Sequence, residues 1–326
     1  MNVLPLLQCL ADGDYHSGQD LGLRLGISRA AIWKQMQVVR ELGVGIEAIT
    51  GRGYRVSGGL DLLDRSEIRR HLAGSAVSFA DRFDLHFSTG STNTDAMAKV
   101  EQGFDSWLVM TEHQSRGRGR RGRQWVSPFG HNLYQSLLWT FQGGIAALEG
   151  LSLVCALVVL RTLNTLGYEG ITLKWPNDVL FNGRKLAGIL LEVSGDVAGP
   201  CRVVMGIGLN TAMPAGAGTE IDQPYSDLLS AGKGVVDRNQ LAGALINEWV
   251  LALEQFERTG FSDVRDEWMR SDAYMGQRVE IKSGARAIVG VSTGVDSAGR
   301  LLLDTDAGCI TVAGGELLPS LRPVFA

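Results

Sequence analysis

The sequence is poor in cysteine and has no long apolar run. Its 326 residues include four cysteines that lie far apart, with no CxxC pair and no histidine at metal-ligand spacing: Cys9, Cys155, Cys201 and Cys309. This arrangement argues against a disulfide framework or a zinc site and is typical of free thiols in a reducing compartment. The most apolar stretch, Ser152 to Leu160, is nine residues long. It is too short to span a bilayer and predicts a buried helix, so we expect no membrane partner.

The N-terminus lacks the basic segment with which a secretory signal begins. Residues 1–14 contain no Lys or Arg and include the acids Asp12 and Asp14, so we expect no signal peptide and a cytoplasmic protein. Hydrophobic residues make up 45% of the chain and charged residues 20%, as in ordinary globular proteins. The net charge of −4 and the pI near 5.8 exclude indiscriminate wrapping of nucleic acid.

Acidic residues are missing from one segment of this mildly acidic chain. From His113 to Leu148 there is no Asp or Glu, and five of the eight residues from Arg116 to Arg123 are arginine. A local cationic loop in an acidic protein predicts a site for an anion rather than a general polyanion surface. A solvated basic loop is the alternative.

Turn signals divide the chain into three predicted domains, and the fold class is α+β multidomain. The predicted domains are residues 1–62, 63–273 and 274–326. In the second domain, strands are predicted at 84–88, 106–112, 133–140, 171–174, 178–181, 185–193 and 202–209, and longer helices at about 92–102, 146–166 and 238–258. Residues 211–227 form a long loop of the kind that often serves as a lid. The third domain alternates in short runs that predict about five strands in a small barrel.

The first domain has the pattern of a winged helix-turn-helix. Ser17 and Ser28 are placed to cap two short helices separated by Gly26, and a hairpin with a basic tip around Arg52 follows. A plain helical hairpin beside a β-hairpin is the alternative. A recognition helix in the major groove with a wing on the phosphates would use the capping serine and the cations, and the residues we predict to bind DNA are Ser28, Arg29, Lys34, Arg40 and Arg52. Residues 1–60 have a net charge of only +1, so specific binding requires a dimer.

Three clusters in the second domain carry candidate chemistry. Residues 117–122 match GxGxxG, but no apolar helix follows and no acid lies about twenty residues on, which argues against a dinucleotide fold. Their glycines let a ligand approach the backbone, and their guanidinium groups suit carboxylate and phosphate. Trp125, just beyond, either stacks on a purine or belongs to the core.

The second and third clusters lie on strands. Lys174 to Asp178 reads KWPND, and the strand that follows contains Lys185 among apolar residues. A lysine there is costly to bury unless it meets an anion, although an edge-strand lysine that blocks aggregation is the alternative. Gly206 to Asn210 reads GIGLN; its glycines either admit a flat ligand or simply pack tightly.

These motifs resemble those of the bifunctional biotin–protein ligases that also repress biotin operons, the BirA type. The resemblance extends over all three domains, in the stretches SGQDLGLRLGISRAAIWKQ, STN at 91–93, GRGRRGRQW at 117–125, SPFGHNLY, KWPNDV, GRKLAGILLE and GIGLN. It implies a winged helix-turn-helix, a central biotin/lipoate-ligase-like domain and a C-terminal SH3-like barrel. A near-duplicate, Ser88 to Gly90, precedes the STN motif, and Arg116 is an extra cation without an assigned role.

The resemblance also implies the site residues. The residues expected at biotin are Ser91, Thr92, Asn93, Gln114, Arg118, Gly119, Arg120 and Lys185. Those expected at ATP are Arg120, Arg123, Trp125, Asn177, Lys185 and Asn210. The catalytic set is Lys185, Asp178, Arg120 and Lys174. No protein metal site is expected, because Mg²⁺ would be held through the ATP phosphates.

The activity implied is ATP-dependent biotinylation of a lysine on the biotin carboxyl carrier domain of acetyl-CoA carboxylase, through biotinyl-5′-AMP. That adenylate would promote homodimerisation and binding to operator DNA upstream of biotin biosynthesis genes. Two alternatives stay open. A lipoate ligase would use the same adenylate chemistry, and a regulator that senses biotin without ligating it would bind DNA but transfer nothing.

Overall fold

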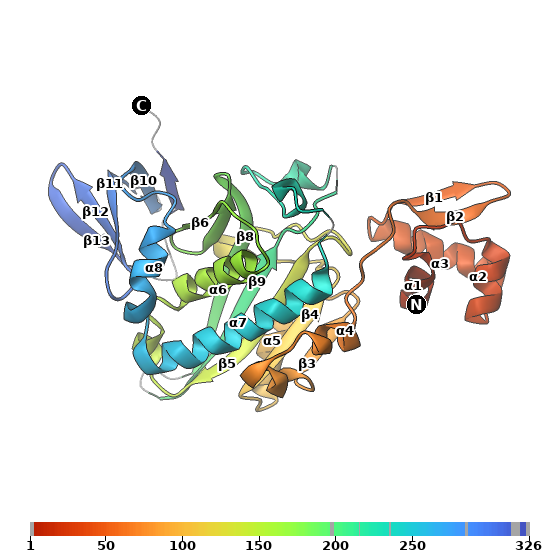
Figure 1. Ribbon diagram of the computed structural model, residues 1–326, viewed down its shortest axis with the longest axis horizontal. Coiled ribbons are helices and arrows are strands. Elements are labelled where there is room, and N and C mark those ends of the chain that lie inside the picture. The colour runs from red at the N-terminus through yellow and green to blue at the C-terminus, as the bar shows by residue number, and fades with distance from the viewer. Residues whose placement is uncertain are drawn as a thin grey trace.

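The computed structural model describes residues 3–195, 199–214, 216–234, 236–283, 286–313 and 320–323. Figure 1 shows a small N-terminal unit at one side of a larger body, and a unit of short strands at the opposite end of that body. Three separate sheets of two, seven and five strands correspond to these three parts. The three-part organisation predicted from the sequence is therefore present, while the boundaries after residues 62 and 273 stay predictions.

The N-terminal unit consists of three helices and a hairpin. Its elements are α1 (Leu4–Leu10), α2 (Gly18–Leu25), α3 (Arg29–Glu41), β1 (Ile46–Ile49) and β2 (Gly53–Val56). The Oγ atoms of Ser17 and Ser28 accept hydrogen bonds from the first turns of α2 and α3, as predicted. Gly26 ends α2 with φ 66°, in the left-handed region that glycine enters without strain. The hairpin pairs antiparallel, so the predicted wing is confirmed.

The central body is built on one mixed sheet in the order β3-β4-β5-β9-β8-β7-β6. The strands are β3 (Phe83–His86), β4 (Ser106–Thr111), β5 (Leu133–Phe141), β6 (Ile171–Lys174), β7 (Asp178–Phe181), β8 (Arg184–Gly195) and β9 (Cys201–Leu209). Each lies within two residues of its predicted range. Only β3 and β4 pair in parallel. Asn182 and Gly183 have positive φ between β7 and β8, the conformation that Asn-Gly pairs favour in two-residue hairpin turns.

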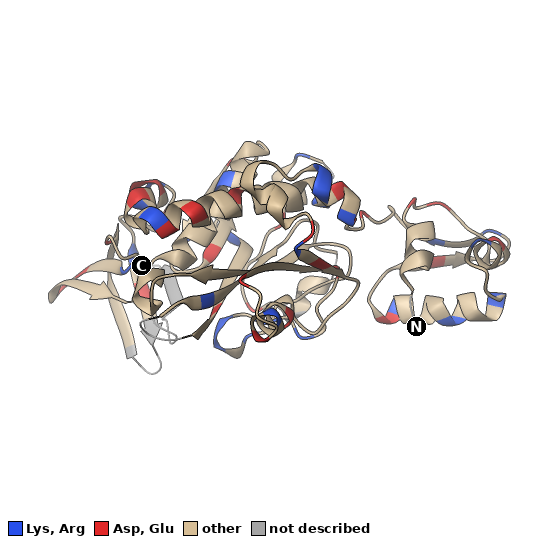
Figure 2. Cartoon of the chain, turned by 90° about the horizontal axis from the view of Figure 1, so that it is seen from below, with Lys and Arg blue, Asp and Glu red and all other residues tan. Residues whose placement is uncertain are grey.

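Helices cover both faces of this sheet, as Figures 1 and 2 show. The long helices are α5 (Thr92–Glu101), α6 (Leu151–Thr165) and α7 (Arg238–Thr259). Ala96 of α5 packs with Val109, Leu138 and Val204 in a small cluster on one face. The opposite face carries the main core, in which α6 and α7 pack on the sheet. Because the α5 side has the smaller apolar cluster, it leaves room for polar side chains.

Helix α6 corrects the expected length of the apolar stretch. An 18-residue window within Ile145–Thr165 has a mean hydropathy of 1.9, so this segment is long and apolar enough to span a membrane by length and composition alone. The 3-10 turn Ile145–Leu148 precedes α6, so the helix predicted for 146–166 begins only at Leu151. The helix is buried around nearly its whole circumference, because the sheet and α7 pack on it. These contacts are those of a core helix.

Shorter elements complete the chain. They are α4 (Arg65–Arg70), α8 (Arg265–Arg270) and the 3-10 turns Gly74–Phe79, Arg120–Gly122, Ala217–Glu220, Leu229–Ala231 and Ser262–Val264. The C-terminal sheet has the order β13-β12-β11-β10-β14. Its strands are β10 (Arg278–Ser283), β11 (Arg286–Val295), β12 (Leu301–Thr305), β13 (Gly308–Val312) and β14 (Ser320–Pro323). All its pairings are antiparallel, in agreement with the β-rich domain predicted.

A buried arginine joins the linker to the central body. Arg238, at the start of α7, is 2% exposed, and its Nη1 lies 2.8 Å from Glu112 Oε2 and 3.0 Å from the carbonyl oxygen of Asn132. The same guanidinium donates to the carbonyl oxygen of Asp61 in the linker. Asn239 adds bonds to the backbone of Asp64 and Leu62. The linker is therefore part of the folded body rather than a flexible tether.

Arg238→Met is expected to lower the free energy of unfolding by roughly 3–5 kcal/mol, because the buried Glu112 carboxylate loses its cationic partner and keeps only the hydrogen bond from the Leu63 N–H. Denaturation followed by tryptophan fluorescence measures this change. Adding Glu112→Gln should recover part of the loss. Arg161→Met is the control, since its ion pairs with Glu248 and Glu267 are a quarter to a third exposed and should cost about 1 kcal/mol. An equal loss in both variants would contradict this interpretation.

Candidate active site and nucleic-acid interface

Glycines on β8 and β9 create a flat area on the α5 side of the sheet. Gly188 and Gly208 are paired across the two strands, and the indole of Trp125 lies directly on both. A Cβ at Gly208 would approach the ring to 2.4 Å, and one at Gly188 to 2.9 Å. The glycines therefore admit a flat group, as predicted, but the group found there is the protein's own tryptophan. Trp125 is half-buried, and its indole N–H is buried without a hydrogen-bond partner among the described residues.

The third glycine of this area makes room for Asn93. A Cβ at Gly206 would come within 2.1 Å of Asn93 Oδ1. Ser136 Oγ donates to that oxygen at 2.6 Å, and Asn93 Nδ2 donates to Glu192 Oε2 at 2.8 Å. Of the two alternatives for these glycines, tight packing applies at Gly206, because the Asn93 amide fills the space. The STN motif lies at the start of α5, where it meets β5 and β8.

Gln114 connects this motif to the basic loop. Its Oε1 accepts from the backbone N–H of Thr92 at 2.9 Å, and its Nε2 donates to Ser127 Oγ at 3.3 Å. The near-duplicate residues 88–90 run alongside 113–116 in backbone hydrogen bonds, so they extend the β3–β4 pairing. Residues 91–93 lie at the start of α5 beside this pairing, and Ser91, Thr92 and Asn93 are about 5% exposed.

The loop 117–125 folds back on itself beside these residues. The N–H of Trp125 donates to Gly117 O at 2.9 Å, and that of Gly119 donates to Arg123 O at 2.7 Å. Arg121 has φ 59°, a left-handed conformation that is uncommon for a residue with a side chain. The three-residue 3-10 turn Arg120–Gly122 lies inside the GxGxxG match, and the next element along the chain is the strand β5. The dinucleotide-binding alternative lacks the helix that it requires.

Arg118 is tied to the strand side of the site. Its Nη2 lies 2.9 Å from Glu192 Oε2 and 3.2 Å from Thr94 Oγ1. Glu192 thus joins Arg118 to Asn93. The Arg116 side chain lies over Gly90, so the extra cation flanks the start of α5 rather than the strands.

The strongest charge cluster combines Lys185, Asp178 and Arg120. Lys185 Nζ lies 2.7 Å from Asp178 Oδ1, in an ion pair whose geometry is not that of a hydrogen bond, and 5.5 Å from the Trp125 ring centroid. Arg120 Nη1 donates to Asn177 Oδ1 at 3.0 Å. Burial lowers the pKa of Arg120, and the nearby Asp178 charge opposes that shift. KWPND is the tight turn between β6 and β7, with Lys174 paired to Asp178.

The long loop 211–227 borders this cluster. Lys185 exchanges backbone hydrogen bonds with Pro224 and Ser226, at 3.0 and 2.9 Å. Asn210 Nδ2 donates to Ser226 O at 3.0 Å, so the end of β9 holds the same loop. Most predicted residues therefore converge on one area. Arg123 does not: it is exposed, and the described contacts place only its backbone in the loop's hydrogen bonding.

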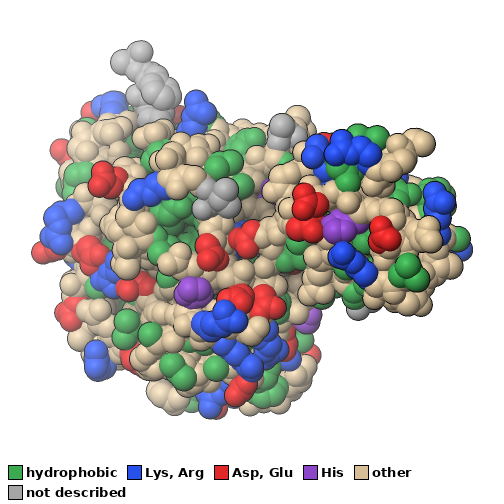
Figure 3. Space-filling model, turned by 45° about the vertical axis from the view of Figure 1, so that its right-hand side comes forward, with side chains coloured by type: hydrophobic (Ala, Val, Ile, Leu, Met, Phe, Trp, Pro, Cys, Tyr) green, Lys and Arg blue, Asp and Glu red, His purple; other side chains and the backbone are tan. Residues whose placement is uncertain are grey.

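The predicted DNA-binding residues gather on α3 and the wing. Arg29, Lys34 and Arg40 are exposed on the helix. On the wing, the guanidinium carbons of Arg52 and Arg55 lie 4.3 and 4.6 Å from the ring centroid of Tyr15. Figure 3 shows Lys and Arg side chains along the outer edge of this unit. A planar guanidinium stacked on a ring is pre-ordered for a phosphate.

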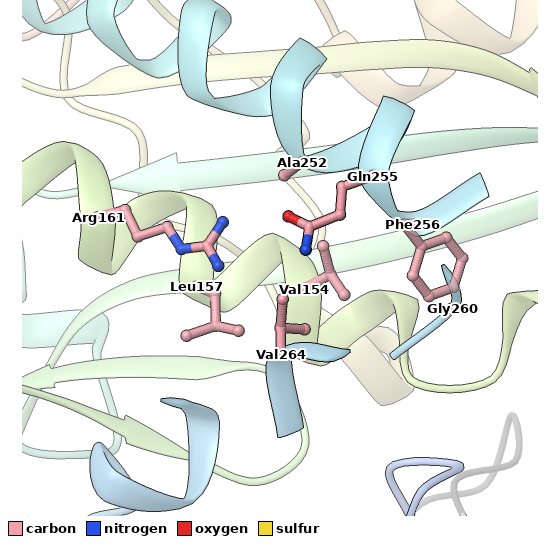
Figure 4. Close-up of a pocket in the computed structure, with 8 residues that line it drawn as sticks. All are labelled: Val154, Leu157, Arg161, Ala252, Gln255, Phe256, Gly260 and Val264. Carbon is pink, nitrogen blue, oxygen red and sulfur yellow. The ribbon is translucent and has the colours of Figure 1, made fainter. Parts of the chain in front are cut away.

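Cavities elsewhere do not compete with this site. The hollow in Figure 4, between α6 and α7, has a volume of about 10 Å³, near the size of one water molecule. A larger cavity of about 520 Å³ lies between α1 and the linker, away from the charge cluster. Within the described residues, no group of three or more His, Cys, Asp or Glu is placed to hold a metal ion.

Known proteins match this chain along its whole length. The model of the Biotin/lipoate A/B protein ligase family matches residues 88–210, an HTH domain model matches 3–55, and the Biotin protein ligase C terminal domain matches 274–317. The bifunctional ligase/repressor BirA of Salmonella typhimurium is 40% identical over 319 residues, which cover 98% of this chain and 97% of the relative. The chain belongs to the BirA family of bifunctional ligase/repressors.

Two further relatives extend the comparison for this BirA family member. The biotin--[acetyl-CoA-carboxylase] ligase of Mycobacterium tuberculosis is 32% identical over 269 residues, which cover 78% of this chain and 95% of the relative. The solved structure of the biotin protein ligase from Aquifex aeolicus in complex with biotin and ATP has a TM-score of 0.63 and 27% identity. It covers 74% of this chain and 99% of its own.

Sequence reasoning missed four polar residues of this BirA-type site. Ser136 and Glu192 complete the Asn93 network, and both stand out as polar residues in otherwise apolar strands, which was a usable signal. Asp272 and Tyr274 come from the segment after α8, which pairs with Leu173 through backbone bonds of 2.7 and 2.8 Å. No local pattern marks them, because only the tertiary fold brings them beside β6.

Asp272 is a buried carboxylate with one unused oxygen. Its Oδ1 accepts from the N–H of Tyr274 at 3.0 Å, while Oδ2 is buried with no partner among the described residues. Burial raises the pKa of Asp272 to about 6. Burial also raises the pKa of Tyr274, and the charges of Asp178 and Asp272 add to that shift. Tyr274 therefore lies within electrostatic range of both carboxylates.

Asp272→Asn is expected to raise the free energy of unfolding at pH 8 by roughly 1–3 kcal/mol. The pKa is higher in the folded protein than the ordinary value of 3.8, so this residue destabilises the fold increasingly as the pH rises from about 4 to 6. The gain at pH 5 should be about half of that at pH 8, measured by urea denaturation at both values.

The control is Asp64→Asn. Hydrogen bonds, first from the Ser66 side chain, hold the pKa of Asp64 below its ordinary value, so this change should lower the stability at pH 8. A gain for Asp272→Asn that is the same at pH 5 and pH 8 would rule out a titrating carboxylate.

Proposed function

We propose that this protein is an ATP-dependent biotin–protein ligase that also represses transcription. The observation that carries the ligase proposal is the convergence of Lys185, Asp178 and Arg120 beside Trp125 on the glycine area. The family relation supports it, as does the related Aquifex aeolicus enzyme in complex with biotin and ATP. The assigned substrates are biotin, ATP and a lysine on a biotin carboxyl carrier domain.

Electrostatics explains why the chemistry needs this cluster. In the first step, a biotin carboxylate oxygen bonds to the α-phosphorus of ATP, and the bond to pyrophosphate breaks. Two anions must approach each other, so fixed cations stabilise the transition state. Lys185 and Arg120 stand at the site, and Lys174 lies on the adjoining turn. Mg²⁺ on the ATP phosphates would supply further positive charge without a protein cage. If a carboxylate of the protein contacts that ion, we assign the contact to Asp178.

The second step transfers biotin to the carrier. The lysine amine attacks the acyl carbon of biotinyl-5′-AMP, AMP leaves, and an amide forms with loss of one proton from the amine. Asp178 lies in this area and is a suitable acceptor for that proton. The loops 117–125 and 211–227 border the site and would shield the anhydride from water.

We assign to the two ligands the residues that the family resemblance implies, although Arg123 is exposed and lies outside the area where the others converge. The biotin set is Ser91, Thr92, Asn93, Gln114, Arg118, Gly119, Arg120 and Lys185. The ATP set is Arg120, Arg123, Trp125, Asn177, Lys185 and Asn210. Trp125 would serve as the stacking surface for a flat ring, since its indole lies over glycines and leaves its N–H unpaired.

The repressor role rests on the winged unit. Its exposed cations Arg29, Lys34, Arg40 and Arg52, with Ser28 at the helix start, face outward from the body. Because residues 1–60 have a net charge of only +1, one copy holds DNA weakly, so we assign a homodimer that the adenylate stabilises by population shift. Operator DNA near biotin biosynthesis genes is the assigned target, and the cytoplasm is the assigned location.

Lys185→Ala should reduce adenylate formation by about a hundredfold or more, since it removes the cation beside the reacting anions. The measurement is biotin transfer to a purified carrier domain with ATP and Mg²⁺, and the adenylate is identified by mass. Lys233→Ala is the matched control: Lys233 also lies over an aromatic ring, that of Tyr168 at 5.8 Å, but away from the cluster, and transfer should be unchanged.

Three results of that assay bear on the proposal. If the protein forms an adenylate of lipoate instead of biotin, it is a lipoate ligase and the biotin-ligase proposal is wrong. Biotin-dependent DNA binding without transfer would reduce the protein to a regulator. An unaffected Lys185→Ala variant would leave the ligase proposal without its central residue.

Arg120→Gly should release biotinyl-5′-AMP faster, by about tenfold or more, because the loop loses its hydrogen bond to Asn177 and a cation near the phosphate. Rapid filtration of preformed enzyme–adenylate complex gives the rate. Arg202→Gly is the control, since Arg202 is bonded to Asp105 at the far end of β9. Equal retention in the wild type and Arg120→Gly would contradict the assigned loop role.

A further inference from the structure

One face of α3 is exposed along two full turns. Ile32, Met36 and Val39 are fully buried and anchor the helix to its own unit. The opposite face carries the sequence Ala30, Trp33, Lys34 and Gln37, at the i, i+3, i+4, i+7 spacing of a single helix face. Trp33 is 55% exposed and stands at the centre of this face. Ala30, Trp33 and Lys34 are exposed and Gln37 is half-buried, so the face presents an indole, an ammonium and a methyl group and part of an amide to the outside.

The wing and the start of α3 are held in a fixed relation. Gly18 is packed between them: a Cβ at Gly18 would be in van der Waals contact, at 3.5 Å, with both Arg29 Cγ and Tyr54 Cε2. His16 pairs with Tyr54 through backbone bonds of 2.8 Å, which attaches the wing to the segment before α2. Tyr15, next to it, carries the two wing arginines. Arg55 is ion-paired with Glu47 at 2.8 Å, so Arg52 is the wing cation that we assign to a phosphate.

We propose that Trp33 is a base-reading residue, which contacts the C5-methyl group of a thymine in the DNA major groove. The inference rests on the proposed DNA-binding function and names the base group that the protein would recognise. Gln37, one turn further along, then meets an adenine through its amide. Arg29, Lys34, Arg40 and Arg52 position the helix on the backbone.

The chemistry of the groove distinguishes these roles. The thymine methyl is the apolar group that the major groove offers, whereas adenine presents an acceptor and a donor that match a glutamine amide. Phosphate contacts carry no sequence information. Residues 33 and 37 are about 6 Å apart along the helix axis, which is close to two base-pair steps. The half-site is therefore expected to contain a thymine and an adenine within about two steps of each other.

Exposure alone does not single out Trp33, because Leu23 on α2 is 75% exposed in the same unit. Leu23 lies on the first helix of the motif, which crosses the backbone in helix-turn-helix complexes. The two residues lie on different helices of the motif, and both have large apolar side chains that are exposed. Leu23→Ala is therefore the matched control for Trp33→Ala, and neither change removes a buried side chain.

The test begins with the full-length protein, biotin, ATP and Mg²⁺ on a pool of randomised DNA duplexes. Wild-type protein should select a two-fold site with one preferred thymine per half-site. Replacing that thymine by deoxyuridine, which removes only the methyl group, should weaken wild-type binding at least fivefold. Trp33→Ala should lose a similar factor on the thymine duplex and none on the deoxyuridine duplex. Leu23→Ala should behave as wild type on both.

The remaining outcomes separate this inference from the function on which it rests. If wild-type protein binds no DNA, the proposed repressor function is wrong. If it selects a site but Trp33→Ala retains the same consensus and the same deoxyuridine effect, Trp33 does not read the base and the inference is overturned. If Trp33→Ala loses affinity for every duplex alike and no longer sediments as a dimer, Trp33 is a subunit contact, which also overturns the inference.

Discussion

The buried ion pair of Arg238 and Glu112 is the constraint on which the arrangement of the parts depends. A guanidinium that is 2% exposed requires acceptors on every side, and the protein supplies them from the linker, from the end of β4 and from the segment before β5. Asn132, which accepts from Arg238, also accepts from Thr211 N–H through its side chain. The orientation of the N-terminal unit and the base of the long loop therefore depend on one desolvated charge.

The candidate site follows a second constraint, the absence of side chains on three strand residues. Gly188, Gly206 and Gly208 lower the surface of the sheet on the side of α5, and Trp125 and Asn93 occupy the space. Polar side chains gather around this area because the main apolar core lies on the other face. The cations then stand at its border, where they meet carboxylates of their own chain.

Much of the fold was accessible from the sequence because its signals are local. The caps at Ser17 and Ser28, the Asn182–Gly183 turn and the alternation of the strands each report a short-range preference. The site was accessible through its motifs, yet two details were not. The indole of Trp125 can pack equally well on a ligand or on the sheet. The backbone path of the loop 117–125 places it on Gly208, and no local sequence pattern predicts that path. Asp272 lies far from β6 in the sequence, so only the tertiary fold reveals it.

The contact between Trp125 and the strand glycines has a consequence for how the sequence can vary. At 2.4 Å from a Cβ at Gly208, the indole and any larger residue exclude each other, so the effects of changes at these positions are not additive. A substitution at Gly208 harms the wild-type background yet can be tolerated when position 125 carries a small side chain. The loop and the sheet are thus mutationally coupled, and a library that randomises only one of them samples mainly inactive combinations.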